Sequence, residues 1–305
     1  MSTRGRSNGS VARLATLPAM PSTAASNPAA LEREYNARAT IPDHPQIFAR
    51  WAEQAAMTRR RRAGLIDMPY GDDPGERLDF FPTMQRNSPL LVFIHGGYWR
   101  SLDKFDFSWI APPFLDAGVS VAFLNYGLAP RVPIDEMVRQ QLRALAWLYT
   151  RAEELGFDNR RIVVGGHSAG GHLAAMMMAA LWPAFDPSLP PDLVKGGLAI
   201  SGLYDLEPLV PLPFINTDLN LDAAAARAVS PVHLPAATEA PLVTAVGALE
   251  SGEFKRQTQL IRRSWPRNAT EDIEVAAANH LTVCDALADA ESPLFRAALA
   301  LVTSV

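Results

Sequence analysis

Short apolar runs alternate with amphipathic segments along most of this chain, from residue 77 to the C-terminus. Short runs rich in Val, Ile and Leu predict buried strands, whereas apolar residues at three- or four-residue spacing predict helices. The predicted strands are residues 78–81, 90–94, 119–125, 162–165, 197–201, 242–246 and 273–277. This alternation predicts an α/β fold, in which a mostly parallel central sheet carries helices on both faces.

Segment 133–155 has the clearest helical pattern. Its apolar residues recur on one face, Pro133 stands at its start and Gly156 follows its end, as the preferences for the two ends of a helix predict. Residues 28–62 also follow a helical pattern, with a break at 42–45. We therefore expect N-terminal helices within residues 28–65, ahead of the sheet.

Two segments depart from the alternation. Residues 1–27 are rich in Ser, Ala and Pro and predict a disordered leader. Residues 206–235 are rich in Pro and Leu, with one short Ala-rich helix at 223–227. We expect this insertion and the N-terminal helices to form a small cap over the site, the alternative being a long surface loop. Residues 28–305 are expected to form one domain.

Composition narrows the class of protein. Hydrophobic residues make up 48% of the chain and charged residues 20%, the balance of a soluble globular enzyme. A net charge of -4 argues against nucleic-acid binding, and the basic run 59–62 is interpreted as a solvated helix end. No apolar run is long enough to cross a membrane. The single cysteine, Cys284, excludes an internal disulfide and indicates a reducing, cytoplasmic compartment.

A serine lies at a predicted strand–turn–helix junction. The sequence GHSAG at residues 166–170 follows a predicted strand and precedes an Ala- and Met-rich helical segment. A serine at such a turn adopts a strained backbone that lifts its hydroxyl clear of the sheet. We predict that Ser168 is a nucleophile, the alternative being a serine that only caps the helix.

A second glycine motif, HGGYW at residues 95–99, directly follows the predicted strand 90–94. Adjacent glycines let backbone N–H groups approach a reacting carbonyl without interference from side chains. We expect Gly96 and Gly97 to form an oxyanion hole with the N–H of Ala169, and His95 to anchor the loop. Without the serine motif, a plain glycine turn would be the better interpretation.

A serine nucleophile needs a general base, and the chain has six histidines. In hydrolases with such an elbow, the acid and then the histidine follow the nucleophile, each in a loop after a late strand. His280 follows the last predicted strand directly. By contrast, His44 precedes the core, His167 and His172 belong to the elbow and its helix, and His233 precedes the strand expected to carry the acid. We predict His280 as the base.

The acid should follow the predicted strand 242–246. Glu250 is the first carboxylate there and Glu253 is its rival, whereas Asp205 comes too early in the chain. A carboxylate in this position orients the imidazole and stabilises its charged form. We favour Glu250.

Aromatic residues adjoin these motifs. Tyr98 and Trp99 follow the glycines directly, and Tyr126 follows another strand end, so we expect all three to line the substrate pocket. A buried packing role is the alternative for Trp99. No metal-binding motif is present, and neither a metal nor another cofactor is expected.

Longer motifs carry a family resemblance. They are HGGYWR at 95–100, NYGLAP at 125–130, GHSAGGHL at 166–173, ESGEFKRQ at 250–257 and EYN at 34–36. Together they resemble the α/β-hydrolase superfamily, its hormone-sensitive-lipase-like branch and, within it, the kynurenine formamidase (arylformamidase) group, from about residue 30 to the C-terminus. The resemblance implies an α/β-hydrolase fold and cofactor-independent hydrolysis of an N-formyl aryl amine or a related small ester. Glu250 stands where animal members carry Asp.

The sequence thus predicts a serine hydrolase that cleaves a small acyl ester or amide through an acyl-enzyme intermediate. Arylformamidase and short-chain carboxylesterase are the two activities expected, with a small, aromatic acyl substrate as the partner. A catalytically silent scaffold or small-ligand receptor is the competing hypothesis, and the complete triad argues against it. Homo-oligomer formation is left open.

Overall fold

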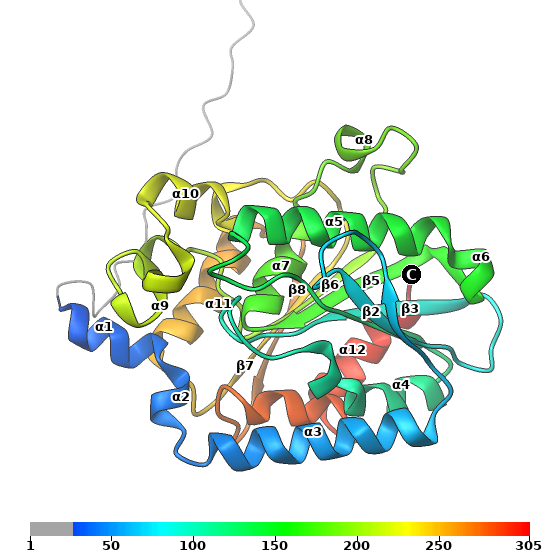
Figure 1. The fold of residues 1–305 in the computed structure, drawn as a ribbon, viewed down its shortest axis with the longest axis horizontal. Helices are drawn as coiled ribbons and strands as arrows, with labels where there is room; N and C mark the ends of the chain where they lie inside the picture. Colours follow the sequence, from blue (N-terminus) through cyan, green and yellow to red (C-terminus); the bar gives the residue numbers. More distant parts are fainter. Residues whose placement is uncertain (1–26) are drawn as a thin grey trace, which may run out of the picture.

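An eight-stranded sheet runs through the centre of the computed structural model, which describes residues 27–305 (Figure 1). Its strand order is β1-β2-β4-β3-β5-β6-β7-β8, and β3 to β8 are mutually parallel, as predicted. The strands are β1 (Leu65–Pro69), β2 (Arg77–Phe81), β3 (Ser88–Ile94), β4 (Ser120–Leu124), β5 (Phe157–His167), β6 (Gly196–Ile200), β7 (Leu242–Gly247) and β8 (Ala269–Val275). The leader predicted for residues 1–27 lies, except for Asn27, outside the described residues.

Helices cover both faces of this sheet, as the sequence predicts. The α-helices are α1 (Pro28–Tyr35), α2 (Ala37–Thr40), α3 (His44–Arg61), α4 (Ala111–Asp116), α5 (Ile134–Thr150), α6 (Ala152–Leu155), α7 (Ala169–Met178), α8 (Trp182–Phe185), α9 (Pro213–Leu219), α10 (Ala223–Ala228), α11 (Gly252–Ser264) and α12 (Pro293–Thr303). Short 3₁₀ helices are η1 (Lys104–Asp106), η2 (Ser108–Ile110), η3 (Glu207–Leu209), η4 (Pro231–His233) and η5 (Thr282–Leu287). None of the helices in residues 27–305 is long and apolar enough to cross a bilayer.

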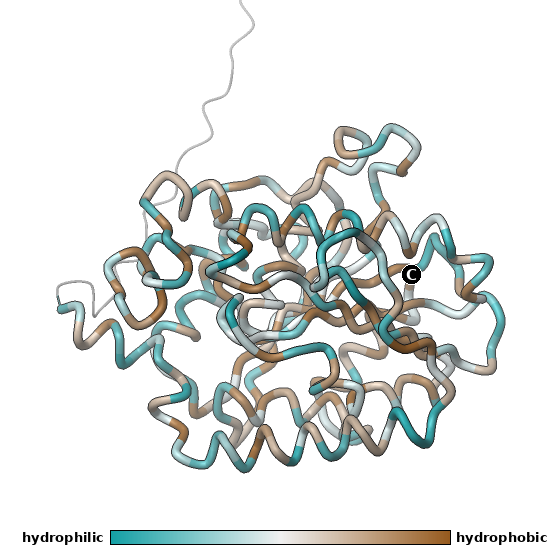
Figure 2. Tube along the Cα trace, viewed as in Figure 1, coloured by the Kyte–Doolittle hydropathy of each residue, from teal (hydrophilic) through white to brown (hydrophobic). Residues whose placement is uncertain are grey.

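Successive side chains of a strand point to opposite faces of the sheet, so the core consists of two clusters, one on each face. Along β3, Leu90, Val92 and Ile94 join the cluster under α1, α5, α7 and α11. Leu91 and Phe93 join the cluster under α3, α4 and α12. All five side chains are fully buried, because a strand covered by helices on both faces has no polar side. Figure 2 shows the hydrophobic residues concentrated in these central strands.

Three elements were not predicted or were predicted as part of another element, and β5 and β8 begin earlier than predicted, at Phe157 and Ala269. Strand β1 was not predicted; it pairs antiparallel with β2 at the sheet edge through an irregular register, and its Leu65 is 48% exposed, so it lacks a buried pattern. The helix predicted at 133–155 is two helices, α5 and α6, separated at Arg151. Helix α9 was also not predicted, since only two of its seven residues, Ile215 and Leu219, are buried.

The insertion 206–235 is more structured than predicted. It contains η3, α9, α10 and η4, whereas the sequence indicated only the short helix at 223–227. Figure 1 shows α9 and α10 at the same end of the molecule as α1. Helix α1 and the insertion, which are far apart in the sequence, therefore lie at the same end of the molecule in this view.

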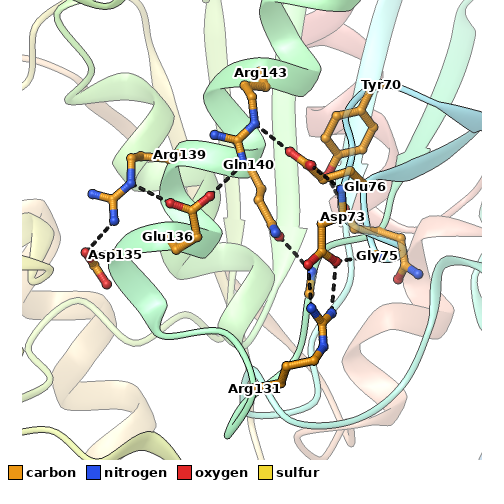
Figure 3. A network of polar contacts seen from close by, with 12 residues as sticks. Tyr70, Asp73, Gly75, Glu76, Arg131, Asp135, Glu136, Arg139, Gln140 and Arg143 are labelled. Carbon is orange, nitrogen blue, oxygen red and sulfur yellow. Dashed lines mark hydrogen bonds and ion pairs between the residues drawn. The ribbon is translucent and has the colours of Figure 1, made fainter.

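A polar network ties α5 to the loops beside the sheet (Figure 3). Glu76 is 3% exposed, and its Oε1 accepts a hydrogen bond from Arg143 Nε of α5 at 2.5 Å. Gln140, also on α5, accepts from the backbone N–H of Gly127 at 2.7 Å. Buried polar groups are costly unless paired, so these bonds fix the loop that follows β4. That loop supports the site described next.

Candidate active site

Ser168 lies at the junction between β5 and α7, in a backbone conformation that residues with a side chain rarely adopt. Its φ is 56° and its ψ is -117°, and its N–H donates to the carbonyl of Ile200 at 2.8 Å. The bend requires glycine nearby: a Cβ at Gly170 would lie 1.9 Å from the carbonyl oxygen of Ile94. The predicted strand–turn–helix junction is therefore present, with its serine raised at the turn.

A continuous chain of hydrogen bonds joins Ser168 to a histidine and a carboxylate. Ser168 Oγ lies 3.0 Å from His280 Nε2, and His280 Nδ1 lies 2.7 Å from Glu250 Oε2. Glu250 is in the loop between β7 and α11, and His280 is in the loop between β8 and η5. The rival carboxylate, Glu253, instead accepts a hydrogen bond from Tyr35 at 2.9 Å. The structure thus brings Glu250, not Glu253, to His280.

The second carboxylate oxygen of Glu250, the one that does not contact His280, accepts two further hydrogen bonds. Its Oε1 accepts hydrogen bonds from Ser201 Oγ at 2.5 Å and from the backbone N–H of Gly247 at 2.7 Å. Ser201 directly follows β6, the neighbour of β7 in the sheet. Sequence reasoning did not select Ser201, although a hydroxyl at the end of the strand beside the acid is a usable signal. These bonds fix the orientation of the carboxylate beside His280.

The ring of His280 lies between two other rings. Its centroid is 4.1 Å from that of Phe254 and 4.8 Å from that of His167. His167 also contacts the backbone, with its Nε2 2.7 Å from the carbonyl oxygen of His280. Burial lowers the pKa of His167 well below its usual value, so its ring is neutral and donates this bond through Nε2–H. Sequence reasoning gave neither ring a role.

The glycine loop after β3 has a left-handed backbone at three consecutive residues. The φ values are 108° at Gly97, 54° at Tyr98 and 55° at Trp99. Such conformations cost about 1–3 kcal/mol each for residues with a side chain and persist only where the surroundings enforce them. Among the described residues, no acceptor is bonded to the N–H of Gly97, and Ala169 begins α7, so its N–H has no partner within the helix.

His95 anchors one end of this loop, as the sequence predicts. Its Nε2 lies 2.8 Å from Asn125 Oδ1, and its ring stacks on Tyr126 with centroids 4.5 Å apart. Tyr126 in turn donates from its hydroxyl to the carbonyl of His95 at 3.0 Å. Tyr70, at the end of the network in Figure 3, donates to the carbonyl of Asn125 at 2.6 Å. The loop after β4 therefore supports the loop after β3.

The other end of the glycine loop is held by His172 on α7. Trp99 Nε1 donates to His172 Nδ1 at 3.3 Å, and His172 Nε2 lies 2.7 Å from the carbonyl oxygen of Val229 in the insertion. This pattern requires a neutral imidazole with its proton on Nε2, because Nδ1 accepts. One histidine thus links the elbow helix, the glycine loop and the insertion.

The three aromatic residues expected to line the pocket pack within the protein. Trp99 has no exposed surface, Tyr126 is 1% exposed and Tyr98 is 9% exposed. Tyr98 donates from its hydroxyl to the carbonyl of Tyr35 and packs edge-on against Phe214, with ring centroids 5.9 Å apart. Trp99 and Tyr126 present almost no surface to a ligand in this conformation, so contact between them and a substrate remains a prediction.

Known proteins share both the fold and the motifs of this chain. A family model named BD-FAE matches residues 78–186. A crystal structure from Silicibacter sp. TM1040, of a protein provisionally described as a thioesterase, has a TM-score of 0.79 and 32% identity and covers 90% of this chain and 98% of that one. Kynurenine formamidase from Salmo salar is 30% identical over 239 residues, which are 74% of this chain and 78% of that protein. The chain belongs to the kynurenine formamidase-like group of α/β-hydrolases.

Membership of this group establishes that the chain is a hydrolase with an α/β-hydrolase fold. A second relative, carboxylesterase NlhH from Mycobacterium tuberculosis, is 36% identical over 116 residues, covering 37% of this chain and 34% of that protein. It supports the resemblance to the hormone-sensitive-lipase-like branch. The relatives therefore include an enzyme named for a formamide and an enzyme named for an ester.

One group of side chains in the described part of this hydrolase has a spacing compatible with a metal ion. Asp205, Glu207 and His233 place ligand atoms within 4.8 Å of one another. Arg227 already occupies this group, with Nη1 3.2 Å from Glu207 Oε1 and 3.3 Å from His233 Nε2. The arginine supplies the positive charge there, and the group is not part of the hydrogen-bond chain of Ser168.

The burial of His172 predicts a pH-dependent stability. Burial lowers the pKa of His172 from 6.5 to about 4, so between these values the unfolded chain binds a proton that the native protein does not. The free energy of unfolding should therefore decrease as the pH falls, by about 2 kcal/mol at pH 5 from this residue. Urea unfolding of the parent and of His172→Gln at pH 7 and pH 5 measures the effect. Equal pH dependence in both proteins would contradict it.

Proposed function

We propose that this hydrolase acts through an acyl-enzyme, with Ser168 as nucleophile, His280 as general base and Glu250 as the orienting acid. The observation that carries the proposal is the hydrogen-bond chain from Ser168 Oγ through the two nitrogens of His280 to Glu250, at 3.0 and 2.7 Å. A serine hydroxyl is a weak nucleophile until a neighbouring base takes its proton. A carboxylate on the far nitrogen holds the imidazole in the required tautomer and stabilises its charged form.

The reaction proceeds in two halves. Ser168 Oγ attacks the acyl carbon while its proton moves to His280 Nε2, and the carbonyl oxygen gains a negative charge. The N–H groups of Gly96, Gly97 and Ala169 stabilise that charge as the oxyanion hole. His280 then gives its proton to the leaving amine or alcohol, and the same residues activate a water molecule that releases the acid.

The substrate we infer is an N-formyl aryl amine or a small aryl ester. The relatives named kynurenine formamidase and carboxylesterase support both linkages. The setting of the nucleophile supports a short acyl group, since Ser168 is 2% exposed and the loop beside it is tightly packed. The N-terminal helices and the insertion act as the cap over this site.

Removal of the nucleophile tests the mechanism directly. Ser168→Ala should fold and lower kcat by about 10⁴–10⁶-fold, as loss of a nucleophile does in related triads. A fluorophosphonate probe should label the parent and not the variant. Alanine keeps the Cβ of serine and therefore the same backbone strain at this turn, so the variant should match the parent in thermal stability. Retained activity, or equal labelling of both proteins, would overturn the assignment of Ser168, whereas a parent that neither reacts with the probe nor cleaves any ester would be a scaffold.

Matched substitutions of the two neighbouring glutamates test which of them is the acid. Glu250→Gln should lower kcat by about 10²–10⁴-fold, because a neutral amide no longer stabilises the charged imidazole. Glu253→Gln should retain most of the activity, since Glu253 bonds to Tyr35 rather than to His280. The measurement is the steady-state kcat of the parent and of both variants with one aryl acetate. The opposite order of effects would identify Glu253 as the acid.

A substrate series tests the acyl preference. We expect kcat/KM to be highest for N-formylkynurenine or aryl acetates and to decrease steeply with longer acyl chains. An open apolar pocket would give the reverse trend, since each added methylene contributes about 1–3 kcal/mol of binding there. The comparison uses N-formylkynurenine, phenyl acetate and phenyl hexanoate. If the hexanoate were best and N-formylkynurenine were not cleaved, the enzyme would be a general carboxylesterase.

A further inference from the structure

A cavity of about 270 Å³ is lined in part by His280, whose side chain is 7% exposed. One wall consists of the N-terminal segment from Glu34 to Asp43, which includes the turn between α2 and α3. The opposite wall consists of the loops after β7 and β8, with Glu250, Phe254 and His280. The cavity therefore joins the first helices of the chain to two members of the hydrogen-bond chain.

The chemistry of acyl transfer indicates what such a cavity would hold. In the mechanism proposed above, His280 protonates the leaving group, so the leaving atom must come within hydrogen-bond distance of the imidazole. The leaving group must then extend on the His280 side of the scissile bond. The volume is near the lower end of the range for small-molecule pockets, about 300–1,000 Å³, and suits one ring with a short substituent.

Among the described residues, the charged side chains that line the cavity are acidic. No lysine or arginine of this part of the chain lines it, and Glu34 and Asp43 are among the lining residues, whereas the side chain of Glu250 has no exposed surface. Glu250 is already bonded to His280. Glu34 Oε2 accepts only a backbone bond, from the N–H of Glu253 at 3.2 Å, and within the described residues neither Glu34 nor Asp43 forms an ion pair. No cation of the described residues therefore competes with a ligand for either carboxylate.

We propose that this cavity is the leaving-group subsite and that Glu34 and Asp43 make it selective for leaving groups with a positively charged substituent, such as an ammonium group. The proposal rests on the function proposed above and adds the charge class of the substrate. Apolar side chains, Ile41 of the N-terminal segment and Phe254 of α11, face the ring that carries the substituent. An aryl amine or phenol with an aminoalkyl side chain fits these features.

Matched substrates test this selectivity. 3-(Aminomethyl)phenyl acetate is cationic at pH 7, and 3-ethylphenyl acetate has nearly the same shape without the charge. The readout is the ratio of kcat/KM for the cationic ester to kcat/KM for the neutral ester. Comparing this ratio between the parent and a variant cancels the intrinsic reactivity of the two esters.

We expect the ratio to fall about three- to fivefold in Glu34→Gln and about tenfold in the double variant Glu34→Gln/Asp43→Asn, values set by charge pairs at partly exposed sites. Glutamine keeps an oxygen that can accept from the N–H of Glu253, so the local backbone contact survives. Raising the salt concentration should lower the ratio of the parent and not that of the double variant. Glu32→Gln is the control, since Glu32 lies on the same helix and does not line the cavity.

The outcomes separate two failures. If neither ester is cleaved in a Ser168-dependent manner, the proposed function itself is wrong. If the parent cleaves the neutral ester and the ratio is the same in the parent, the double variant and Glu32→Gln, the subsite proposal is overturned. A preference for an anionic analogue, 3-(carboxymethyl)phenyl acetate, would overturn it equally.

Discussion

Backbone strain in two loops is the constraint on which the candidate site depends. Ser168 and the loop residues Tyr98 and Trp99 all have positive φ values, which an unsupported chain would avoid. Each is held by contacts that come from other elements: the sheet beneath the elbow, Asn125 after β4, and His172 on α7. The polar network around Glu76 and α5 extends this support outward. Much of the polar structure beside the sheet thus serves to keep a few peptide units in unfavourable conformations.

The parts of the fold that depend on local sequence could be predicted. The apolar runs within strands β3 to β7 were predicted because both of their sides face the core, and this burial gives the sequence its pattern. The elbow serine and its two partners could be located because glycines mark the turns and because each partner follows a late strand. The choice of Glu250 over Glu253 rested only on chain order, and the structure brings Glu250 to His280.

The parts that depend on distant contacts could not be predicted. The hydroxyl of Tyr35 bonds to a carboxylate 218 residues away, and nothing in the neighbourhood of either residue indicates the pairing. The bond from Ser201 to Glu250 joins separate strands in the same way. Edge strand β1 and helix α9 bury too few side chains to give a periodic pattern. The aromatic residues after the glycines pack as supports, because a tight loop fills its own space.

Helix α1 is bonded to α11, and this contact affects where the chain can be divided into separate units. Tyr35 bonds to Glu253 and Gln257 on α11, and the same helix carries Phe254 against the ring of His280. The first helix is thus linked through α11 to the ring of His280, although it precedes the sheet and looks like a removable extension. In engineering terms, a chimera joined at β1 would inherit the sheet without the helix that supports α11 beside the imidazole of His280.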